Sequence, residues 1–180
     1  MSSEPEPKLA RRVITGLNAE GRSTIVADGA TPRWVRRPTG SVIMDVWSTG
    51  ALPVRVDDEE NTDGPQLVPP RVGLCVRLAV FPPDEDVDGA GAAAYQAAMH
   101  QIYGDQGNAG GSAAIPGMHR TDTVDVVTVV DGEIWVVLEE GETLLRAGDT
   151  LVQRGTRHAW RNRSDRPCTL ATTMITAVRG

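Results

Sequence analysis

Apolar residues alternate with small or polar residues over much of the chain, and this period of two predicts β-strands. The alternation is longest over 71–81, before Pro82-Pro83 ends it, and one parity there is apolar: Val72, Leu74, Val76, Leu78 and Val80. Further strands are predicted over 41–48, 121–130, 133–138, 143–145, 150–153, 158–161 and 168–178, separated by short turns such as Asp131-Gly132. So many short strands in succession predict an all-β fold, an antiparallel barrel or sandwich.

The N-terminal part of the chain adds three features to this barrel. Two strand-like runs between Arg12 and Asp28 flank the turn sequence 18–21, which predicts a β-hairpin that joins a sheet or exchanges with a partner subunit. Residues 57–70 are acidic and rich in turn formers, so we expect a solvent loop there. The Ala-rich run 90–103 predicts one helix, which either covers the barrel as a fixed element or moves as a lid.

These elements divide the chain into three parts within one compact domain. Residues 1–8 are rich in Ser, Glu and Pro and carry too little apolar surface to become ordered, so we expect a disordered tail. Residues 9–116 hold the N-terminal β extension, the acidic loop and the covering helix. Residues 117–180 hold the densest series of strands, and we expect them to form the barrel.

Composition and charge narrow the class of protein. The 180 residues weigh 19.2 kDa and are 40% hydrophobic, which suits one globular domain. The net charge of -6, with no basic run, argues against nucleic-acid binding. No apolar run approaches the roughly 18 residues of a membrane helix, and residues 1–8 do not resemble a secretory signal, so we expect a cytoplasmic protein without membrane contact. Cys75 and Cys168 lie in apolar, strand-like surroundings and are predicted to be reduced packing residues.

Polar residues suited to chemistry gather near the start of the 117–180 segment. Four of them occupy alternate positions, so on an extended strand their side chains point to one face: His119, Thr121, Thr123 and Asp125. Parity also places His158 and Trp160 on one face of a later strand. A histidine and a carboxylate are costly to bury in a barrel unless they pair or bind a metal. His119, Asp125 and His158 can therefore converge in one functional pocket.

With these residues the chain resembles the cupin superfamily. The spacing of the first cupin motif is matched by His119, Thr121, Asp125 and Gly132. The second motif is matched by Gly148-Asp149 and then by the run 155–162, which contains Gly155, His158 and Asn162. The resemblance covers roughly residues 117–178, about a third of the chain. It implies an antiparallel jelly-roll barrel whose open end holds a pocket, often with Fe, Mn, Zn or Ni.

The motifs depart from the family pattern at positions that matter for metal binding. Thr121 stands where a second His is usual, Asp125 replaces the usual Glu, and Gln153 replaces the Pro of the second motif. The remaining set of His119, Asp125 and His158 has the two-histidine, one-carboxylate composition that suits non-haem Fe(II) with open positions. On this hypothesis the three residues hold a divalent ion in an oxygenase or a Lewis-acid lyase or isomerase.

A second hypothesis keeps the pocket and drops the metal. A neutral His beside a carboxylate is an acid/base pair, because His titrates near neutral pH and the carboxylate supports its charged form. His119 or His158 then moves a proton and Asp125 orients it, in the dehydration, isomerisation or cyclisation of an oxygenated small molecule. A third hypothesis is a pocket that binds a small ligand without turnover. The residues alone leave the three hypotheses open.

Other side chains complete the predicted pocket. Four are expected to contact the small-molecule substrate: Thr121, Thr123, Gln153 and Trp160. His100 lies on the predicted helix outside both motifs and is not expected to be a ligand. The arginines at 33, 36 and 37, and those between 154 and 166, are predicted to be solvated or ion-paired surface. An exposed hairpin edge, together with the family resemblance, favours a homodimer.

Overall fold

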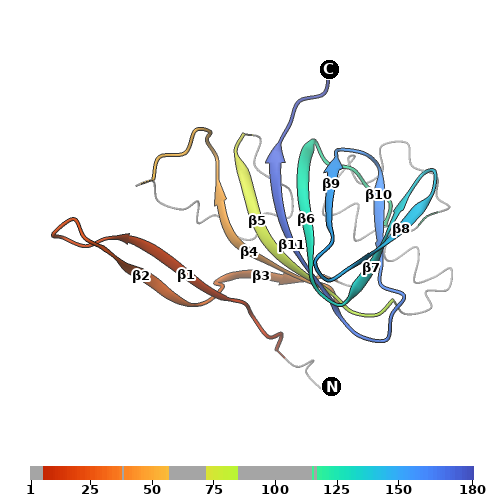
Figure 1. Ribbon diagram of the computed structural model, residues 1–180, viewed down its shortest axis with the longest axis horizontal. Helices are drawn as coiled ribbons and strands as arrows, with labels where there is room; N and C mark the ends of the chain where they lie inside the picture. Colours follow the sequence, from red (N-terminus) through yellow and green to blue (C-terminus); the bar gives the residue numbers. More distant parts are fainter. Residues whose placement is uncertain (1–5, 38, 57–71, 85–114, 116) are drawn as a thin grey trace.

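The computed structural model describes residues 6–37, 39–56, 72–84, 115 and 117–180, and these form an antiparallel all-β structure (Figure 1). The described strands are β1 (Arg11–Leu17), β2 (Ser23–Ala30), β3 (Arg33–Arg36), β4 (Val42–Thr49), β5 (Leu74–Phe81), β6 (Thr123–Asp131), β7 (Glu133–Leu138), β8 (Glu142–Arg146), β9 (Thr150–Arg154), β10 (His158–Arg161) and β11 (Cys168–Thr176). The all-β, antiparallel prediction is confirmed. No helix in the described part of the chain is long and apolar enough to cross a membrane.

Two sheets enclose the interior of a jelly-roll barrel. The larger sheet has the strand order β3-β4-β5-β11-β6-β9, and the smaller has the order β10-β7-β8. The apolar core lies between them and draws on both: Val127, Val129, Ile134, Val136, Leu145, Cys168 and Leu170 are all buried there. Alternation along β6 explains the packing, because every second side chain from Thr123 to Val129 is buried while its neighbours are more exposed.

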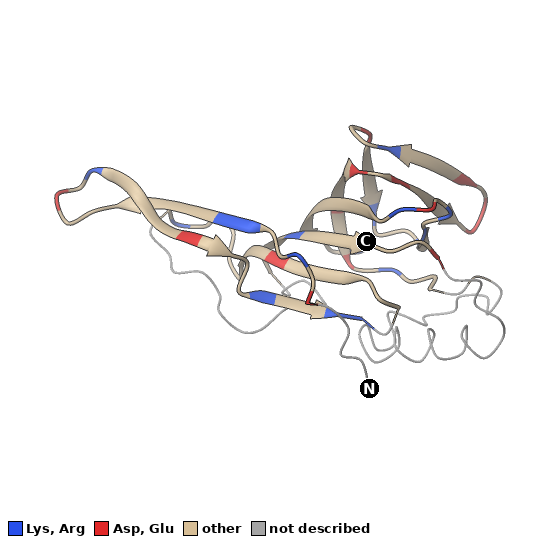
Figure 2. Ribbon diagram, turned by 90° about the horizontal axis from the view of Figure 1, so that it is seen from below, with Lys and Arg blue, Asp and Glu red and all other residues tan. Residues whose placement is uncertain are grey.

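The N-terminal hairpin stands apart from the barrel as an extended arm (Figures 1 and 2). Among the described strands, β1 and β2 pair with each other alone and form a separate two-stranded sheet. The side chain of Asn18 shapes the turn, because its Oδ1 accepts hydrogen bonds from the backbone N–H groups of Glu20 and Arg22. Gly21 then supplies the positive φ of 72° that closes the turn. The predicted hairpin is therefore confirmed, with its turn at the expected position.

The structure differs from the sequence-based expectation in three places. Strand β3 was not predicted, because the arginines at 33, 36 and 37 suggested solvated surface; instead Arg33 is buried and the strand pairs with β4. Strand β6 begins at Thr123 rather than Thr121, so His119 lies before the strand and joins His158 through an isolated β-bridge. The predicted loop at 57–70 and helix at 90–103 lie outside the described residues. Both cysteines are buried and free, as predicted.

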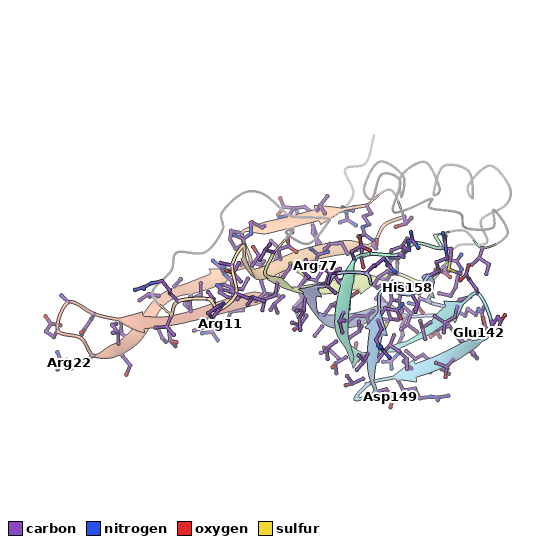
Figure 3. All side chains as sticks on the ribbon, turned by 90° about the horizontal axis from the view of Figure 1, so that it is seen from above. Arg11, Arg22, Arg77, Glu142, Asp149 and His158 are labelled. Carbon is purple, nitrogen blue, oxygen red and sulfur yellow. The ribbon has the colours of Figure 1, made fainter. Side chains whose placement is uncertain are left out.

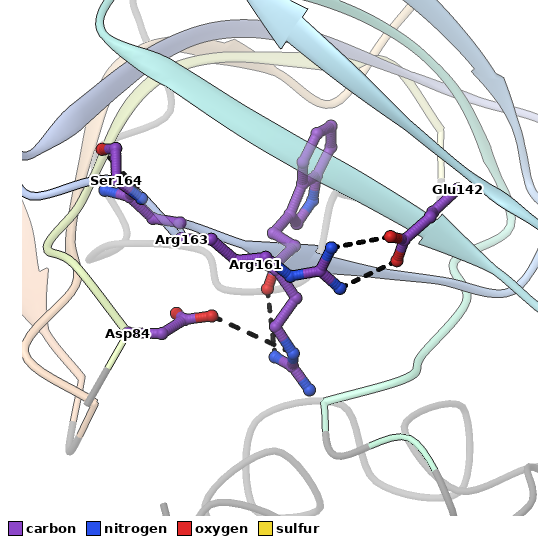
Figure 4. Close-up of polar contacts among 7 residues, drawn as sticks. Asp84, Glu142, Arg161, Arg163 and Ser164 are labelled. Carbon is purple, nitrogen blue, oxygen red and sulfur yellow. Dashed lines mark hydrogen bonds and ion pairs between the residues drawn. The ribbon is translucent and has the colours of Figure 1, made fainter. Parts of the chain in front are cut away.

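Strand β10 is only four residues long, and polar contacts at its end hold it in place (Figure 4). Asn162 is fully buried and donates from Nδ2 to the carbonyl oxygens of Phe81 and Arg166. Arg163 binds Glu142 of β8 through two parallel hydrogen bonds of 2.6 and 2.8 Å. Arg161 lies 4.0 Å from Asp84, which follows β5. These contacts hold β10 at the edge of the smaller sheet, and β10 carries His158 and Trp160.

Candidate functional site

A cavity of about 60 Å³ lies inside the barrel, with walls from both sheets. Its polar lining includes five of the residues that the sequence favoured or grouped by parity: His119, Thr121, Asp125, His158 and Trp160. A cavity of this size has room for roughly four water molecules, at about 15 Å³ of such volume for each, or for one small organic molecule in their place. The cavity is therefore the candidate functional site.

The two histidines form a close pair at one wall of this cavity. The ring centroids of His119 and His158 lie 4.4 Å apart, with 48° between the ring planes. Two backbone hydrogen bonds of 2.9 Å, one in each direction, join the same two residues and set this separation. Trp160 packs edge-on against His158 at 5.8 Å between centroids. A reciprocal bridge between segments 39 residues apart, counted from 119 to 158, therefore creates the pair.

The Nδ1 atom of each histidine has a defined partner. Nδ1 of His119 lies 2.8 Å from the carbonyl oxygen of Gly117, which can only accept, so neutral His119 carries its proton on Nδ1. Nδ1 of His158 lies 3.0 Å from an acceptor, the Thr156 carbonyl, and 3.0 Å from a donor, Nε2 of Gln153. When Nδ1 of His158 is protonated it donates to Thr156, and when it is not it accepts from Gln153. Both neutral tautomers of His158 are therefore supported.

Burial keeps both imidazoles in the neutral form. Desolvation lowers the pKa of His119 well below its usual value, and the charges of His158 and Arg37 lower it further, against the hydrogen bond to Gly117. Desolvation also lowers the pKa of His158, against its hydrogen bond to Thr156. Neutral imidazoles are the form that accepts a proton or binds a metal, because each then has one ring nitrogen with a lone pair.

Asp125 shows the opposite shift for the same reason. It lies on β6 and is 5% exposed, and desolvation raises the pKa of its carboxyl group to about 6. A hydrogen bond from Thr123 and the charge of Arg77 lower that pKa, but burial outweighs both. Among the described residues, Oδ1 of Asp125 is buried without a hydrogen-bond partner. A carboxyl group with a pKa near 6 can exchange a proton close to neutral pH.

Two other predicted pocket residues lie behind the cavity wall rather than in it. The Thr123 hydroxyl is 2.7 Å from that of Thr121, which does line the cavity. Gln153 of β9 is buried and contacts His158 and Thr156, with Nε2 2.8 Å from the Thr156 carbonyl oxygen. Thr123 and Gln153 therefore support residues of the cavity wall, and their contact with a substrate stays a prediction.

Sequence reasoning missed two charged side chains in the cavity lining. Arg77 of β5 and Arg37, which follows β3, both line the cavity. The pairing of β4 with β5 places Asp45 opposite Arg77, and Asp45 Oδ1 lies 3.1 Å from Arg77 Nη2. The alternation over 71–81 could not have found Arg77, because the apolar positions there include Leu74 and Val76, whereas the structure buries the other parity, to which Arg77 belongs. The packed sheet alone shows that Arg77 faces the interior.

The predicted three-residue metal site is not assembled in the described residues. Among them, no group of three or more His, Cys, Asp or Glu side chains is placed to hold a metal ion. The two imidazoles lie together, whereas Asp125 belongs to a separate part of the wall, beside Thr123 and near Arg77. A His119–Asp125–His158 ligand set therefore does not fit this geometry, and no reaction step is assigned to a metal.

Comparison with known proteins identifies relatives of the whole chain and of a shorter segment. The cupin domain family matches residues 108–175. The cupin-domain-containing oxidoreductase srdD of Neurospora crassa is 41% identical over 170 residues, 90% of this chain and 72% of that protein. A second Neurospora crassa protein of the same description, srdB, is 30% identical over 171 residues, 91% of this chain and 72% of that protein.

A local match is stronger but covers less. The phomopsin biosynthesis cluster protein C' of Diaporthe leptostromiformis is 58% identical over 48 residues. That segment is 26% of this chain and 25% of the relative, so most of the relative has no counterpart in the match. Similarity over 90% or more of this chain is found with the proteins described as cupin-domain-containing oxidoreductases, of which it covers 72%.

Proposed function

The chain belongs to the cupin superfamily, and from that premise we propose that it is a small-molecule enzyme that moves protons within the barrel cavity, using His158, His119 and Asp125. One observation carries the proposal: His158 has an acceptor and a donor at equal distance from Nδ1. An imidazole supported in both neutral tautomers can take a proton on one nitrogen and release one from the other.

The reaction we propose begins on a carbon next to a carbonyl group. The lone pair on an imidazole nitrogen accepts the proton from that carbon, and the electron pair of the broken C–H bond moves onto the carbonyl oxygen as an enolate. Where the deprotonated carbon carries a hydroxyl group, the enolate oxygen takes up a proton to give an enediol. Loss of the hydroxyl proton and return of a proton to the former carbonyl carbon then complete an isomerisation. Transfer of the proton to a hydroxyl group in the β position, which then leaves as water, completes a dehydration. Asp125 holds or donates a proton, because its pKa of about 6 lies close to neutral pH.

Exchange of hydrogen with solvent tests this proposal before the substrate is known. Small ketones, 2-oxo acids and 3-hydroxy carbonyl compounds are incubated with the protein in D2O, and deuterium at the carbon next to the carbonyl is followed by NMR. We expect His158→Ala to slow exchange by about 100-fold or more, the usual contribution of a general base. The exposed-surface variant Arg146→Gln is the control and should not change the rate. Exchange that is absent in the wild type, or unchanged in His158→Ala, would contradict the proposal.

A second candidate function is metal-assisted oxidation or Lewis-acid catalysis. Two observations favour it: the adjacent imidazoles of His119 and His158, and the description of the full-length relatives as oxidoreductases. These two histidines would hold the ion (Fe, Mn, Zn or Ni), which would supply redox or Lewis-acid chemistry when bound.

Metal analysis separates the two candidates. Protein purified without a His-rich tag or chelator should contain about one ion per chain on the metal hypothesis, and His119→Ala and His158→Ala should each lose it. Deuterium exchange that persists in chelator supports acid/base chemistry. A protein that is stabilised by a small ligand but turns nothing over would instead be a binding module, the third alternative.

A further inference from the structure

The cavity wall formed by β4 and β5 carries a buried, charged group that the proposed chemistry does not use. Arg77 is 5% exposed, and its Nη2 lies 3.1 Å from Asp45 Oδ1 and 3.3 Å from Cys75 Sγ. Arg77 lines the cavity, whereas Asp45 is 1% exposed and belongs to the wall behind it. Figure 3 shows Arg22 at the tip of the arm, far from both Arg77 and His158. Asp45 therefore holds the Arg77 guanidinium in place from behind.

Arg37 adds a second guanidinium to the same cavity. It follows β3, and the strand order β3-β4-β5 brings its segment to the wall that contains Arg77. The charge of Arg37 is among the causes that lower the pKa of His119, which places Arg37 near the histidine pair. The two arginines and the two imidazoles thus face one small space.

The chemistry of these walls selects the group that can occupy the space. Guanidinium groups are always charged and only donate hydrogen bonds, so a group that contacts both arginines must be an acceptor. A planar carboxylate is the acceptor that best fits their parallel N–H groups. Asp45 offsets one positive charge, and Asp125 is the single carboxyl group in the described part of the cavity lining. Burying the charged Arg77–Asp45 pair costs desolvation free energy. A binding site for an anion would explain why the cavity keeps a buried cation in spite of that cost.

We infer that Arg77 and Arg37 bind a carboxylate group of the substrate and hold the carbon that carries the reacting hydrogen against the His119–His158 pair. The substrate class is therefore a small carboxylic acid that carries a carbonyl or hydroxyl group. The assignment of the reacting carbon rests on the proposed function, but carboxylate binding by the arginines does not. Asp45 acts through Arg77 and is a positioning residue.

Acetate is the probe, because it is the smallest carboxylate with a neutral isostere, acetamide. Thermal stability of the full-length protein is measured against increasing sodium acetate, with sodium chloride used to keep the ionic strength constant. We expect a saturable rise in melting temperature with acetate and no rise with acetamide or with chloride alone. Arg77→Lys keeps the positive charge and the partner Asp45 but loses the planar guanidinium, which can donate two parallel hydrogen bonds to a carboxylate. It should weaken acetate binding about tenfold or more.

Two further variants make the test decisive. Arg37→Gln should also weaken acetate binding about tenfold, and it decides the outcome if Arg77→Lys does not fold, because Arg37 is only partly buried. Arg146→Gln, on the exposed end of β8, is the matched control and should bind acetate like the wild type. A wild type without saturable acetate binding, or Arg37→Gln that binds it unchanged, overturns the inference.

The His158→Ala variant separates this inference from the proposed function. If both hold, His158→Ala binds acetate but no longer catalyses hydrogen exchange. If acetate binding depends on the arginines while exchange does not depend on His158, the carboxylate site stands and the proposed acid/base function fails. If exchange requires His158 but acetate does not bind, the function stands and the substrate is not a carboxylate.

Discussion

Asp125 is the residue at which burial and charge oppose each other most directly. Its carboxyl pKa rises from 3.8 to about 6 in the folded protein, so the folded state binds the proton more tightly than the unfolded state. Stability from this group is present below pH 4 and is lost as the pH rises from about 4 to about 6. Above pH 6 the folded protein holds a buried, charged carboxylate, and this lowers the free energy of unfolding.

Asp125→Asn should therefore stabilise the protein in a pH-dependent way. At pH 7 we expect the free energy of unfolding to rise by up to about 3 kcal/mol, since each pKa unit corresponds to about 1.4 kcal/mol. Below about pH 3 the gain should vanish, because the wild-type carboxyl group is then protonated in both states. Urea unfolding of both proteins at several pH values measures the difference. The two histidines have lowered pKa values, so the protein loses stability from them as the pH falls below 6.5. This loss is the same in the wild type and in the variant.

Gln153 is predicted to position His158 rather than to contact the substrate. Gln153→Met removes the donor that faces Nδ1 of His158 while keeping the side-chain volume, so the Thr156 carbonyl alone determines the tautomer. We expect the ¹⁵N NMR spectrum to show His158 fixed with its proton on Nδ1. The exchange of substrate hydrogen with D2O should slow about tenfold, and the pH dependence of its rate should change. A merely structural role for Gln153 would lower stability and leave the tautomer unchanged.

At the scale of elements, turns decide how the two sheets meet. Gly132 joins β6 to β7 with a φ of 79°, and a Cβ added there would lie 2.8 Å from the carbonyl oxygen of Pro167, just before β11. Gly141 joins β7 to β8 with a φ of 97°, but a Cβ there would meet nothing within 4 Å. Both turns require a residue with a positive φ, which glycine adopts without strain. At Gly132 the absence of a Cβ atom is also required, because the backbone of Pro167 occupies that position.

This difference predicts unequal costs for the same substitution. Gly141→Ala should lower the free energy of unfolding by about 1 kcal/mol, the backbone cost of a positive φ. Gly132→Ala should cost about 3 kcal/mol or more, because the backbone before β11 must also move. Denaturant unfolding of the two variants measures both values. Equal losses would show that the contact with Pro167 is relieved without cost.

At the scale of the whole molecule, the N-terminal arm exposes apolar surface that the described barrel does not cover. Leu17 and Ile25 are 70% and 58% exposed, and the register Thr15↔Ile25 places them with Val13 on one face of the arm. A two-stranded hairpin alone is marginally stable in water, so an arm of this kind needs a partner. We propose that a second copy of the chain is this partner, in a symmetric homodimer.

The double variant Leu17→Ser, Ile25→Ser should convert this dimer to a monomer. Light scattering during size-exclusion chromatography measures the mass, which should fall from two chains to one, because the apolar strip of the arm is lost. Val152→Ser is the matched control, since Val152 is 56% exposed on β9, away from the arm. A wild type that elutes as a monomer, or a double variant that stays dimeric, would contradict the homodimer.

The sequence by itself determined most of the barrel and part of its site. Alternation is a local property of a strand, so the strands from 41 onward could be predicted where they are described, and the cupin motifs identified His119, Asp125 and His158. The parity argument placed Asp125 and Thr123 inside, because both lie on β6 itself. It described His119 as part of that strand, whereas His119 lies before it and is held by His158.

Only the tertiary structure decided which polar groups share the cavity. The order of strands in a sheet depends on packing between segments far apart in sequence, which no local pattern reports. That order places Asp45 of β4 beside Arg77 of β5, and Arg37, which follows β3, lines the same cavity as Arg77 and the histidines. It also separates Asp125 from the imidazole pair, so the ligand set that spacing suggested is not brought together in the described residues. Spacing along the chain determines which side chains of a strand share a face, whereas the order of strands in the sheet determines which residues of other strands lie beside them.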